Sequence, residues 1–258
     1  MTSYFGFSLS SSSNVILRNF YVVIAIVVIT NCMIRVSLAD DKIYVVTENW
    51  YPYNYLDKKG NIVGKSTNVV KAILANAKVD YSIAIYPWTR AFNLASTRPN
   101  VLIYSILRTP QREKLFYWIC PISTQEPHKI YKLTSRKDIV VHSEQDIKKY
   151  TISVTRSTFL HQYMLNLGLV EGVNLQINSD DSIDTKMFFA GRVDLLADLN
   201  SAMQRTLTTQ GLNKAIVTPV LTIPVQRYPA ICMALSKQTP IALVNKLRVA
   251  HQHILSKK

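Results

Sequence analysis

The chain has 258 residues, of which 48% are hydrophobic and 18% are charged. This composition can bury a sizeable core, so it excludes a disordered or fibrous protein and predicts one or two compact units. The formal net charge of +14 raises nucleic acid as a partner, but the lysines and arginines are scattered and form no block of five or six. We therefore expect a solvated basic surface and no nucleic-acid partner.

The first forty residues have the layout of a signal peptide. An uncharged apolar run covers residues 20–30, Arg18 precedes it, and Ser37 to Ala39 offer the small residues that a signal peptidase reads. The run is shorter than the roughly 20 residues that a membrane-spanning helix needs. We expect cleavage after Ala39 and a mature protein in the periplasm or otherwise outside the cytoplasmic membrane. An uncleaved membrane anchor is the alternative.

Hydrophobic periodicity predicts alternating strands and helices in the rest of the chain. The first half contains a strand, a helix, a strand, a helix opened by a proline, and a strand, at 43–47, 66–77, 81–86, 87–96 and 101–104. An apolar stretch follows at 115–122. The plan then repeats, with strands at 151–155, 173–177, 193–197, 216–219 and 230–235 and helices at 158–167, 182–190, 201–210 and 240–255. This alternation indicates mainly parallel sheets in two α/β lobes, with a ligand cleft between the lobes.

Motifs for nucleotide, metal or hydrolytic chemistry are missing from the sequence. The segment 60–66 has three residues between its glycines, where a phosphate-binding loop needs four. His251 and His253 are two residues apart on a predicted helix, so they point to different faces. No HExxH, CxxC or GxSxG occurs. The sequence therefore predicts no cofactor, no metal and no catalytic residue.

Five short segments, taken together and in order, carry a resemblance to a known family. The most specific is SILRTPQREKLF at 105–116, and the others are WYPYNY at 50–55, PWTRA at 87–91, WICPI at 118–122 and AGRVD at 190–194. They resemble the family 3 bacterial extracellular solute-binding proteins, the polar amino acid type, over most of the chain after residue 39. The resemblance implies a two-lobed type II periplasmic-binding-protein-like fold, in which each lobe is a mainly parallel sheet flanked by helices.

In that family the backbone crosses between the lobes twice. The resemblance places the crossings near 121–123 and 230–232, so that residues 1–39 are the signal peptide, 40–122 plus 231–258 form lobe 1, and 123–230 form lobe 2. Cys120 and Cys232 flank these crossings, and in an oxidising compartment they could pair. Two buried free thiols are the alternative. A disulfide here would restrict the closure of the lobes.

The resemblance also implies a ligand-binding site. The signature arginine of the family, which maps to Arg112, holds the α-carboxylate of the ligand, because a guanidinium fork matches a carboxylate bidentately. Ser105 and Thr109 would add hydroxyl donors. In the second lobe, Ser157 and Thr158 can cap a helix whose free N–H groups face an anion.

Aromatic and charged residues complete the expected site. Trp50, Tyr51 and Trp88 are candidates for an aromatic wall against the ligand, with simple packing as the alternative. Asp198 is the candidate partner for a ligand ammonium group, and Arg156 would bring a second cation. The arginines near the predicted cleft favour an anionic group on the ligand.

These inferences together predict a monomeric binding protein that closes on an amino acid or a similar small carboxylate. It would deliver this ligand to the permease of an ABC transporter and perform no chemistry. One alternative is an enzyme on the same scaffold, a dehydratase of the cyclohexadienyl or arogenate type, with Glu48 or Asp198 as the general acid. A membrane-tethered ligand sensor is another.

Overall fold

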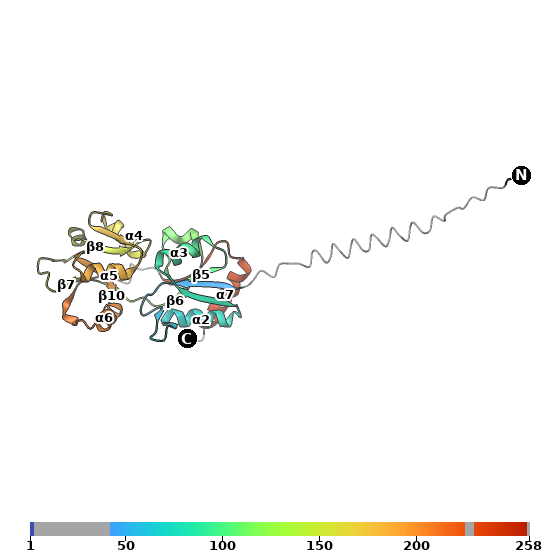
Figure 1. The fold of residues 1–258 in the computed structure, drawn as a ribbon, viewed down its shortest axis with the longest axis horizontal. Helices are drawn as coiled ribbons and strands as arrows, with labels where there is room; N and C mark the ends of the chain where they lie inside the picture. The colour runs from blue at the N-terminus through green and yellow to red at the C-terminus, as the bar shows by residue number, and fades with distance from the viewer. Residues whose placement is uncertain (3–41, 225–229, 257–258) are drawn as a thin grey trace. The chain divides into compact units, whose positions relative to one another are not determined.

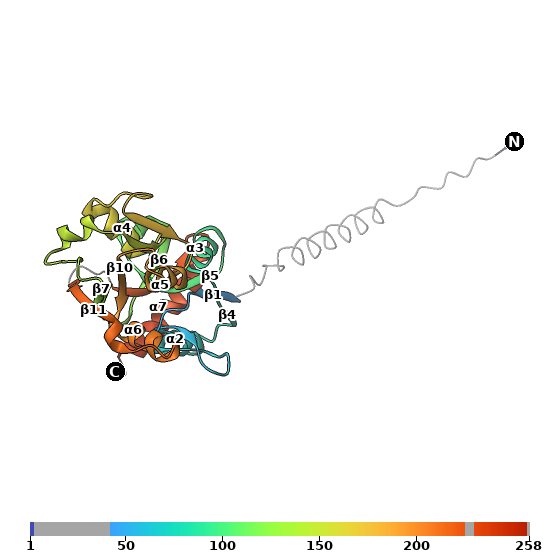
Figure 2. The same ribbon diagram turned by 60° about the vertical axis from the view of Figure 1, so that its left-hand side comes forward.

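The computed structural model describes residues 1–2, 42–224 and 230–256. The signal-peptide prediction therefore falls on a segment that lies almost wholly outside the described residues. Residues Lys42–Lys258 form one compact unit that contains two separate five-stranded sheets (Figures 1 and 2). Within the described ranges, no helix is long and apolar enough to cross a lipid bilayer.

The first sheet has the strand order β4-β1-β5-β12-β6. Its strands are β1 (Ile43–Thr47), β4 (Tyr81–Ile85), β5 (Val101–Leu107), β6 (Phe116–Ser123) and β12 (Ile231–Ser236). β1 pairs with β4 and β5 in parallel, whereas β12 is antiparallel to β5 and β6. Helices α2 (Lys65–Asn76) and α7 (Ile241–Leu255) pack on one face and α3 (Trp88–Thr97) on the other, so β5 is buried along its whole length. A short hairpin, β2 (Tyr55–Leu56) and β3 (Ile62–Val63), precedes α2.

The second sheet has the strand order β11-β7-β10-β8-β9. Its strands are β7 (His128–Leu133), β8 (Ile152–Thr155), β9 (Leu175–Asn178), β10 (Leu195–Leu199) and β11 (Val217–Thr222). β8, β9 and β10 run parallel, and β7 is antiparallel to both β10 and β11. Helix α4 (Phe159–Leu167) packs on one face, and α5 (Asp181–Phe189) and α6 (Asn200–Thr209) pack on the other. Short 3-10 turns cover Pro110–Leu115, Glu144–Lys149 and Lys214–Ile216.

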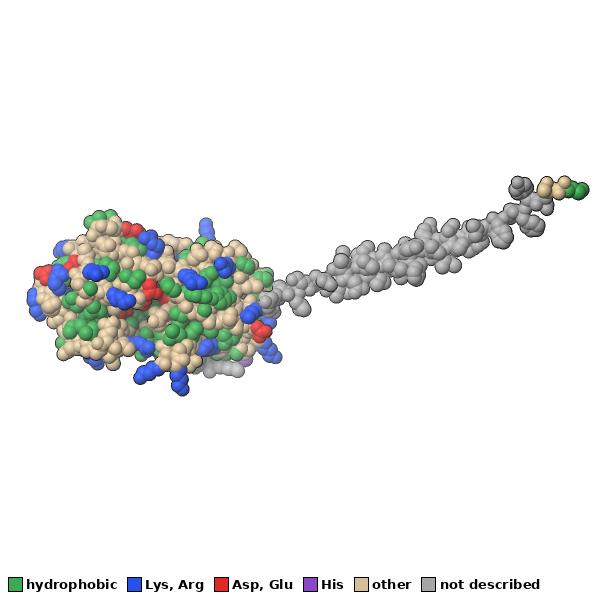
Figure 3. All heavy atoms as spheres, viewed as in Figure 1, with side chains coloured by type: hydrophobic (Ala, Val, Ile, Leu, Met, Phe, Trp, Pro, Cys, Tyr) green, Lys and Arg blue, Asp and Glu red, His purple; other side chains and the backbone are tan. Residues whose placement is uncertain are grey.

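The two-lobed α/β fold with mainly parallel sheets, predicted from the sequence, is confirmed, with one difference in detail. In each sheet four strands run in one direction and one runs against them, β12 in the first sheet and β7 in the second. Strand β7 is not predicted, because Lys129 and Lys132 interrupt its apolar pattern, yet it lies between β10 and β11. On the face shown in Figure 3, lysine and arginine side chains are scattered and not gathered into one patch.

The chain passes between the two sheets after β6 and before β12. The structure joins Cys120 and Cys232 by a disulfide with an S–S distance of 2.03 Å. Both cysteines lie on neighbouring strands of the first sheet, so the bond ties one lobe together beside the crossing and does not link the two lobes. The expectation that a disulfide beside the crossing restricts closure of the lobes stays a prediction. The lobe boundaries at 122/123 and 230/231 remain a proposal.

Glu126 anchors the first crossing to both lobes. Its backbone N–H donates to Tyr53 Oη at 2.8 Å, and Tyr53 is buried in the core of the first lobe. Its carboxylate accepts hydrogen bonds from the backbone N–H and the hydroxyl of Ser201, at the start of α6. The orientation of α6 is therefore tied to the crossing segment.

Candidate ligand-binding cleft

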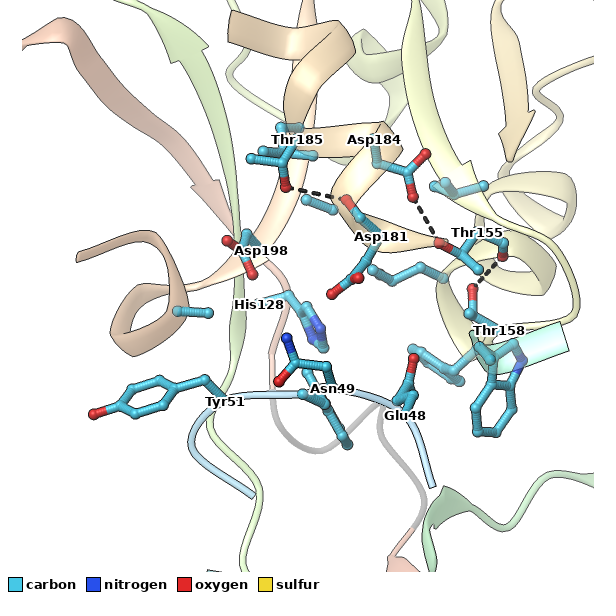
Figure 4. Close-up of a pocket in the computed structure, with 18 of the residues that line it drawn as sticks. Glu48, Asn49, Tyr51, His128, Thr155, Thr158, Asp181, Asp184, Thr185 and Asp198 are labelled. Atoms are coloured by element: carbon cyan, nitrogen blue, oxygen red, sulfur yellow. Dashed lines mark hydrogen bonds between the residues drawn. The ribbon is translucent and has the colours of Figure 1, made fainter. Parts of the chain in front are cut away.

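A cavity of about 230 Å³ lies where the carboxyl ends of strands from both sheets meet (Figure 4). Its lining includes residues that follow or end β1 and β5 in the first sheet and β8 and β10 in the second. This is where ligands bind in open α/β sheets, because loops and helix N-termini converge there. The volume lies just below the usual range for ligand pockets, so the cleft suits a small solute.

Arg112 lies in the cleft and touches both lobes. It belongs to the 3-10 turn that Pro110 opens directly after β5, and its side chain is buried. Nη1 donates to the Leu107 carbonyl at 2.8 Å and Nη2 donates to the Ser157 carbonyl in the second lobe at 2.6 Å. The ring of Trp88 lies 5.2 Å from the guanidinium carbon. Burial lowers the pKa of Arg112 to about 10, and the charge of Glu48 opposes this shift, so the guanidinium is charged at neutral pH.

Two buried donors beside Arg112 are left without hydrogen-bond partners among the described residues. They are Ser105 Oγ and Trp88 Nε1, on side chains that are only 3% exposed and that line the cleft. Ser105 is the extra residue of a β-bulge, because Ile106 pairs with Cys232 while Tyr104 pairs with Met233, and its φ is 59°. Bulges and left-handed backbone at non-glycine residues often aim a side chain at a functional site. These donors mark a place for an acceptor group of a ligand.

Four carboxyl groups also line the cleft: Glu48, Asp181, Asp184 and Asp198. In Figure 4, Glu48 and Asp181 project from opposite walls toward the same space. Burial, and then repulsion from Asp181, raises the pKa of Glu48 well above its usual value. Burial of the carboxyl group raises the pKa of Asp181 to about 7, although the residue as a whole is exposed. Burial and the charge of Asp181 raise the pKa of Asp198 to about 8.

Asp184 differs from the other three because its charge is compensated within the lobe. Its carboxylate accepts hydrogen bonds from Ser153 Oγ, from Thr155 Oγ1 at 2.8 Å and from Asn178 Nδ2 at 2.8 Å. These donors lie on β8 and at the end of β9, and Asp184 lies in the first turns of α5. The network therefore fixes α5 against its sheet, and Asp184 is a positioning residue of the cleft wall.

Aromatic contacts join the two lobes at the rim of the cleft. The guanidinium carbon of Arg205, on α6, lies 4.5 Å from the ring centroids of both Tyr51 and Tyr55. The Trp50 and His128 rings are stacked, with centroids 6.4 Å apart. Burial lowers the pKa of His128 to about 3, so this imidazole is neutral at physiological pH. The rim is thus closed by cation–π and stacking contacts, without an added charge from His128.

The structure brings together most of the residues that the sequence singled out. Seven of them line the cleft: Trp50, Tyr51, Trp88, Ser105, Arg112, Thr158 and Asp198. Thr158 also caps α4, as predicted, by accepting a hydrogen bond from the His161 N–H at 3.1 Å. Asp198 lies within β10 and not after it.

Three expected site residues lie outside the cleft lining. Thr109 is buried before the 3-10 turn, and Ser157 contributes its carbonyl to Arg112 in place of its hydroxyl. Arg156 faces Glu171, with an N–O distance of 4.0 Å, so it does not bring a second cation to the ligand.

Sequence reasoning also missed Asp181, Asp184, Arg205 and His128 as members of the site. The acid-rich segment 180–184 at a predicted helix start was the one available signal for two of these residues. Four carboxyl groups against two guanidinium groups make the cleft acidic. The expected excess of arginines around the ligand is therefore wrong.

Two α/β lobes with a polar cleft at their facing strand ends define a periplasmic-binding-protein-like solute-binding protein. The model of the bacterial extracellular solute-binding proteins, family 3, matches residues 43–218, and the chain belongs to this family.

Solved structures share the fold at low sequence identity. An ancestral arginine-binding protein bound to arginine is 17% identical with a TM-score of 0.68, over 84% of this chain and 93% of the other. A histidine kinase sensor domain with similarity to periplasmic binding proteins is 16% identical with a TM-score of 0.71, over 84% and 91%. A periplasmic binding protein of Salmonella typhimurium with high arginine specificity is 15% identical with a TM-score of 0.68, over 83% and 92%. The comparison with curated sequences found no match.

Proposed function

We propose that this solute-binding protein captures an amino acid, or a similar small carboxylate, outside the cytoplasmic membrane and delivers it as a monomer to the permease of an ABC importer. The observation that carries the proposal is the position of Arg112, which is buried, charged and bonded to the backbone of both lobes beside the unpartnered donors of Ser105 and Trp88. A guanidinium group can bind a carboxylate through two parallel hydrogen bonds. The arginine ligands named for structural neighbours of the same fold support the choice of an amino acid.

A thermal-shift screen against amino acids and small carboxylates tests the proposal. The full-length chain is expressed, and the protein is purified from those cells without further truncation. A ligand at about 100 times its Kd adds roughly 2.7 kcal/mol to the free energy of unfolding, which raises Tm by several degrees. Arg112→Ala and Arg112→Lys should each lose the shift. The matched control is Arg108→Ala, because Arg108 is half-exposed and paired with Glu113 away from the cleft. Equal shifts in Arg112→Ala and Arg108→Ala would contradict the assignment.

An enzyme on the same scaffold is the second candidate function, because two cleft carboxyl groups have raised pKa values. Asp198, with a pKa of about 8, would hold a proton near neutral pH, as a general acid must, and burial shifts the pKa of Glu48 in the same direction. Recovery of each stabilising compound after incubation decides between the candidates. An unchanged compound supports binding alone, and a converted compound supports an enzyme.

A ligand sensor is a third candidate, favoured by the similarity to a histidine kinase sensor domain. Cell fractionation distinguishes it from a free binding protein. A sensor held by an uncleaved N-terminal segment remains with the membrane after a salt wash, whereas a processed binding protein is released with the periplasmic contents.

A further inference from the structure

The cleft has more acidic than basic side chains that a ligand can reach. Asp184 is compensated by three hydrogen-bond donors, but Glu48, Asp181 and Asp198 form no ion pair among the described residues. The guanidinium of Arg205 is engaged by two tyrosine rings at the rim. Arg112 is therefore the cation left inside, and two backbone carbonyls already occupy part of its fork.

Two unpartnered donors beside Arg112 favour a ligand that carries a hydrogen-bond acceptor. Ser105 Oγ and Trp88 Nε1 are buried in the wall of the same cavity without partners among the described residues, and the indole N–H can only donate. They require an acceptor group, which a bare cation lacks. No group of three metal-ligating side chains gathers within the described ranges, so the acids are not arranged as a metal site.

Closure around a neutral solute would leave these carboxylates desolvated without counter-charge, which is costly. A cationic group between Glu48 and Asp181 removes that cost and gains charge-assisted hydrogen bonds. We propose that the cleft selects amino acids with a cationic side chain, whose charge lies between Glu48 on one lobe and Asp181 on the other. The inference rests on the proposed amino-acid function and adds the charge of the side chain to it.

Isothermal titration calorimetry with four probes tests the selectivity. The full chain is titrated at pH 8 with L-arginine, L-lysine, L-glutamine and L-glutamate. We expect arginine or lysine to bind at least tenfold more tightly than glutamine, and glutamate to bind most weakly. Glu48→Gln and Asp181→Asn should each reduce the affinity for the cationic ligand by about tenfold or more and change the affinity for glutamine by less than about threefold. Asp80→Asn, an exposed aspartate outside the cleft lining, is the matched control and should change neither.

The outcomes separate this inference from the proposed function. Glutamine or glutamate binding as tightly as arginine and lysine would overturn the charge selectivity and leave the amino-acid function standing. A wild-type protein that melts cooperatively but binds no amino acid would refute the function and the inference with it. If both amide variants fail to fold, the ranking of the four probes on the wild-type protein still decides.

Discussion

Replacement of Asp198 by asparagine should make the ligand-free protein more stable at high pH. The pKa of Asp198 is about 8 in the folded protein, above its ordinary value of 3.8, so between these limits the folded state holds a proton that the unfolded state releases. The free energy of unfolding contributed by this group is therefore complete below pH 4 and falls as pH rises through 8. Asparagine keeps an oxygen for the Leu199 N–H, which Asp198 Oδ1 now accepts at 2.7 Å, and removes the titration.

The size of this effect follows from the pKa shift and the solvation of the cleft. A shift of this size corresponds to at most about 6 kcal/mol if the group were fully desolvated. Asp198 is only half-buried in the wall of the cleft, so we expect roughly 1–2 kcal/mol between pH 5 and pH 9. The assay is urea unfolding of the wild-type protein, Asp198→Asn and Asp80→Asn at pH 5, 7 and 9. The variant and the wild type should agree at pH 5 and diverge by pH 9. Parallel pH profiles for all three proteins would refute the reasoning.

Three further predictions concern binding and folding. Affinity for a cationic amino acid should fall about tenfold from pH 8 to pH 6. The pKa of Asp181 is about 7, so roughly nine-tenths of this carboxyl group is protonated at pH 6. Equal affinities at the two pH values in calorimetry would contradict this. Asp184→Ala should lower the free energy of unfolding by about 2–4 kcal/mol in urea, because two buried donors and one partly buried donor lose their acceptor. Arg205→Ala should change the free energy of unfolding by no more than about 1 kcal/mol and should speed ligand dissociation in stopped flow. Reduction of the Cys120–Cys232 bond, which spans 112 residues, should cost about 2–4 kcal/mol, and an unchanged urea midpoint in reductant would show that the bond adds no stability.

The acidic cleft carries a trade-off between stability and binding. Neutral substitutions at Glu48, Asp181 or Asp198 should stabilise the ligand-free protein at neutral to alkaline pH, because each removes a carboxylate that burial disfavours. The same substitutions should weaken binding of a cationic ligand. Carboxyl groups without ion-pair partners among the described residues are thus consistent with a site that a ligand completes.

The sequence by itself determined the fold class and located two residues of the site, Arg112 and Thr158. Apolar runs such as 43–47 and helical spacing such as 66–77 report local burial, so alternating strands and helices could be predicted from them. The signature around Arg112 located the buried guanidinium, because the turn that presents it depends on a local Pro110. Thr158 was identified as a helix cap for the same reason, since a cap is made by neighbours in the chain.

Only the tertiary structure decided the charge of the cleft. Glu48 and Asp181 face one another because β1 and α5 belong to different lobes whose strand ends meet, and no local pattern encodes that approach. In the sequence, Arg205 has the pattern of a helix-surface arginine, and only the fold places it over the rings of Tyr51 and Tyr55. Arg156, which was expected in the site, faces Glu171 instead. Local periodicity records which side chains are buried, but the partners of a charge depend on contacts between residues far apart in the sequence.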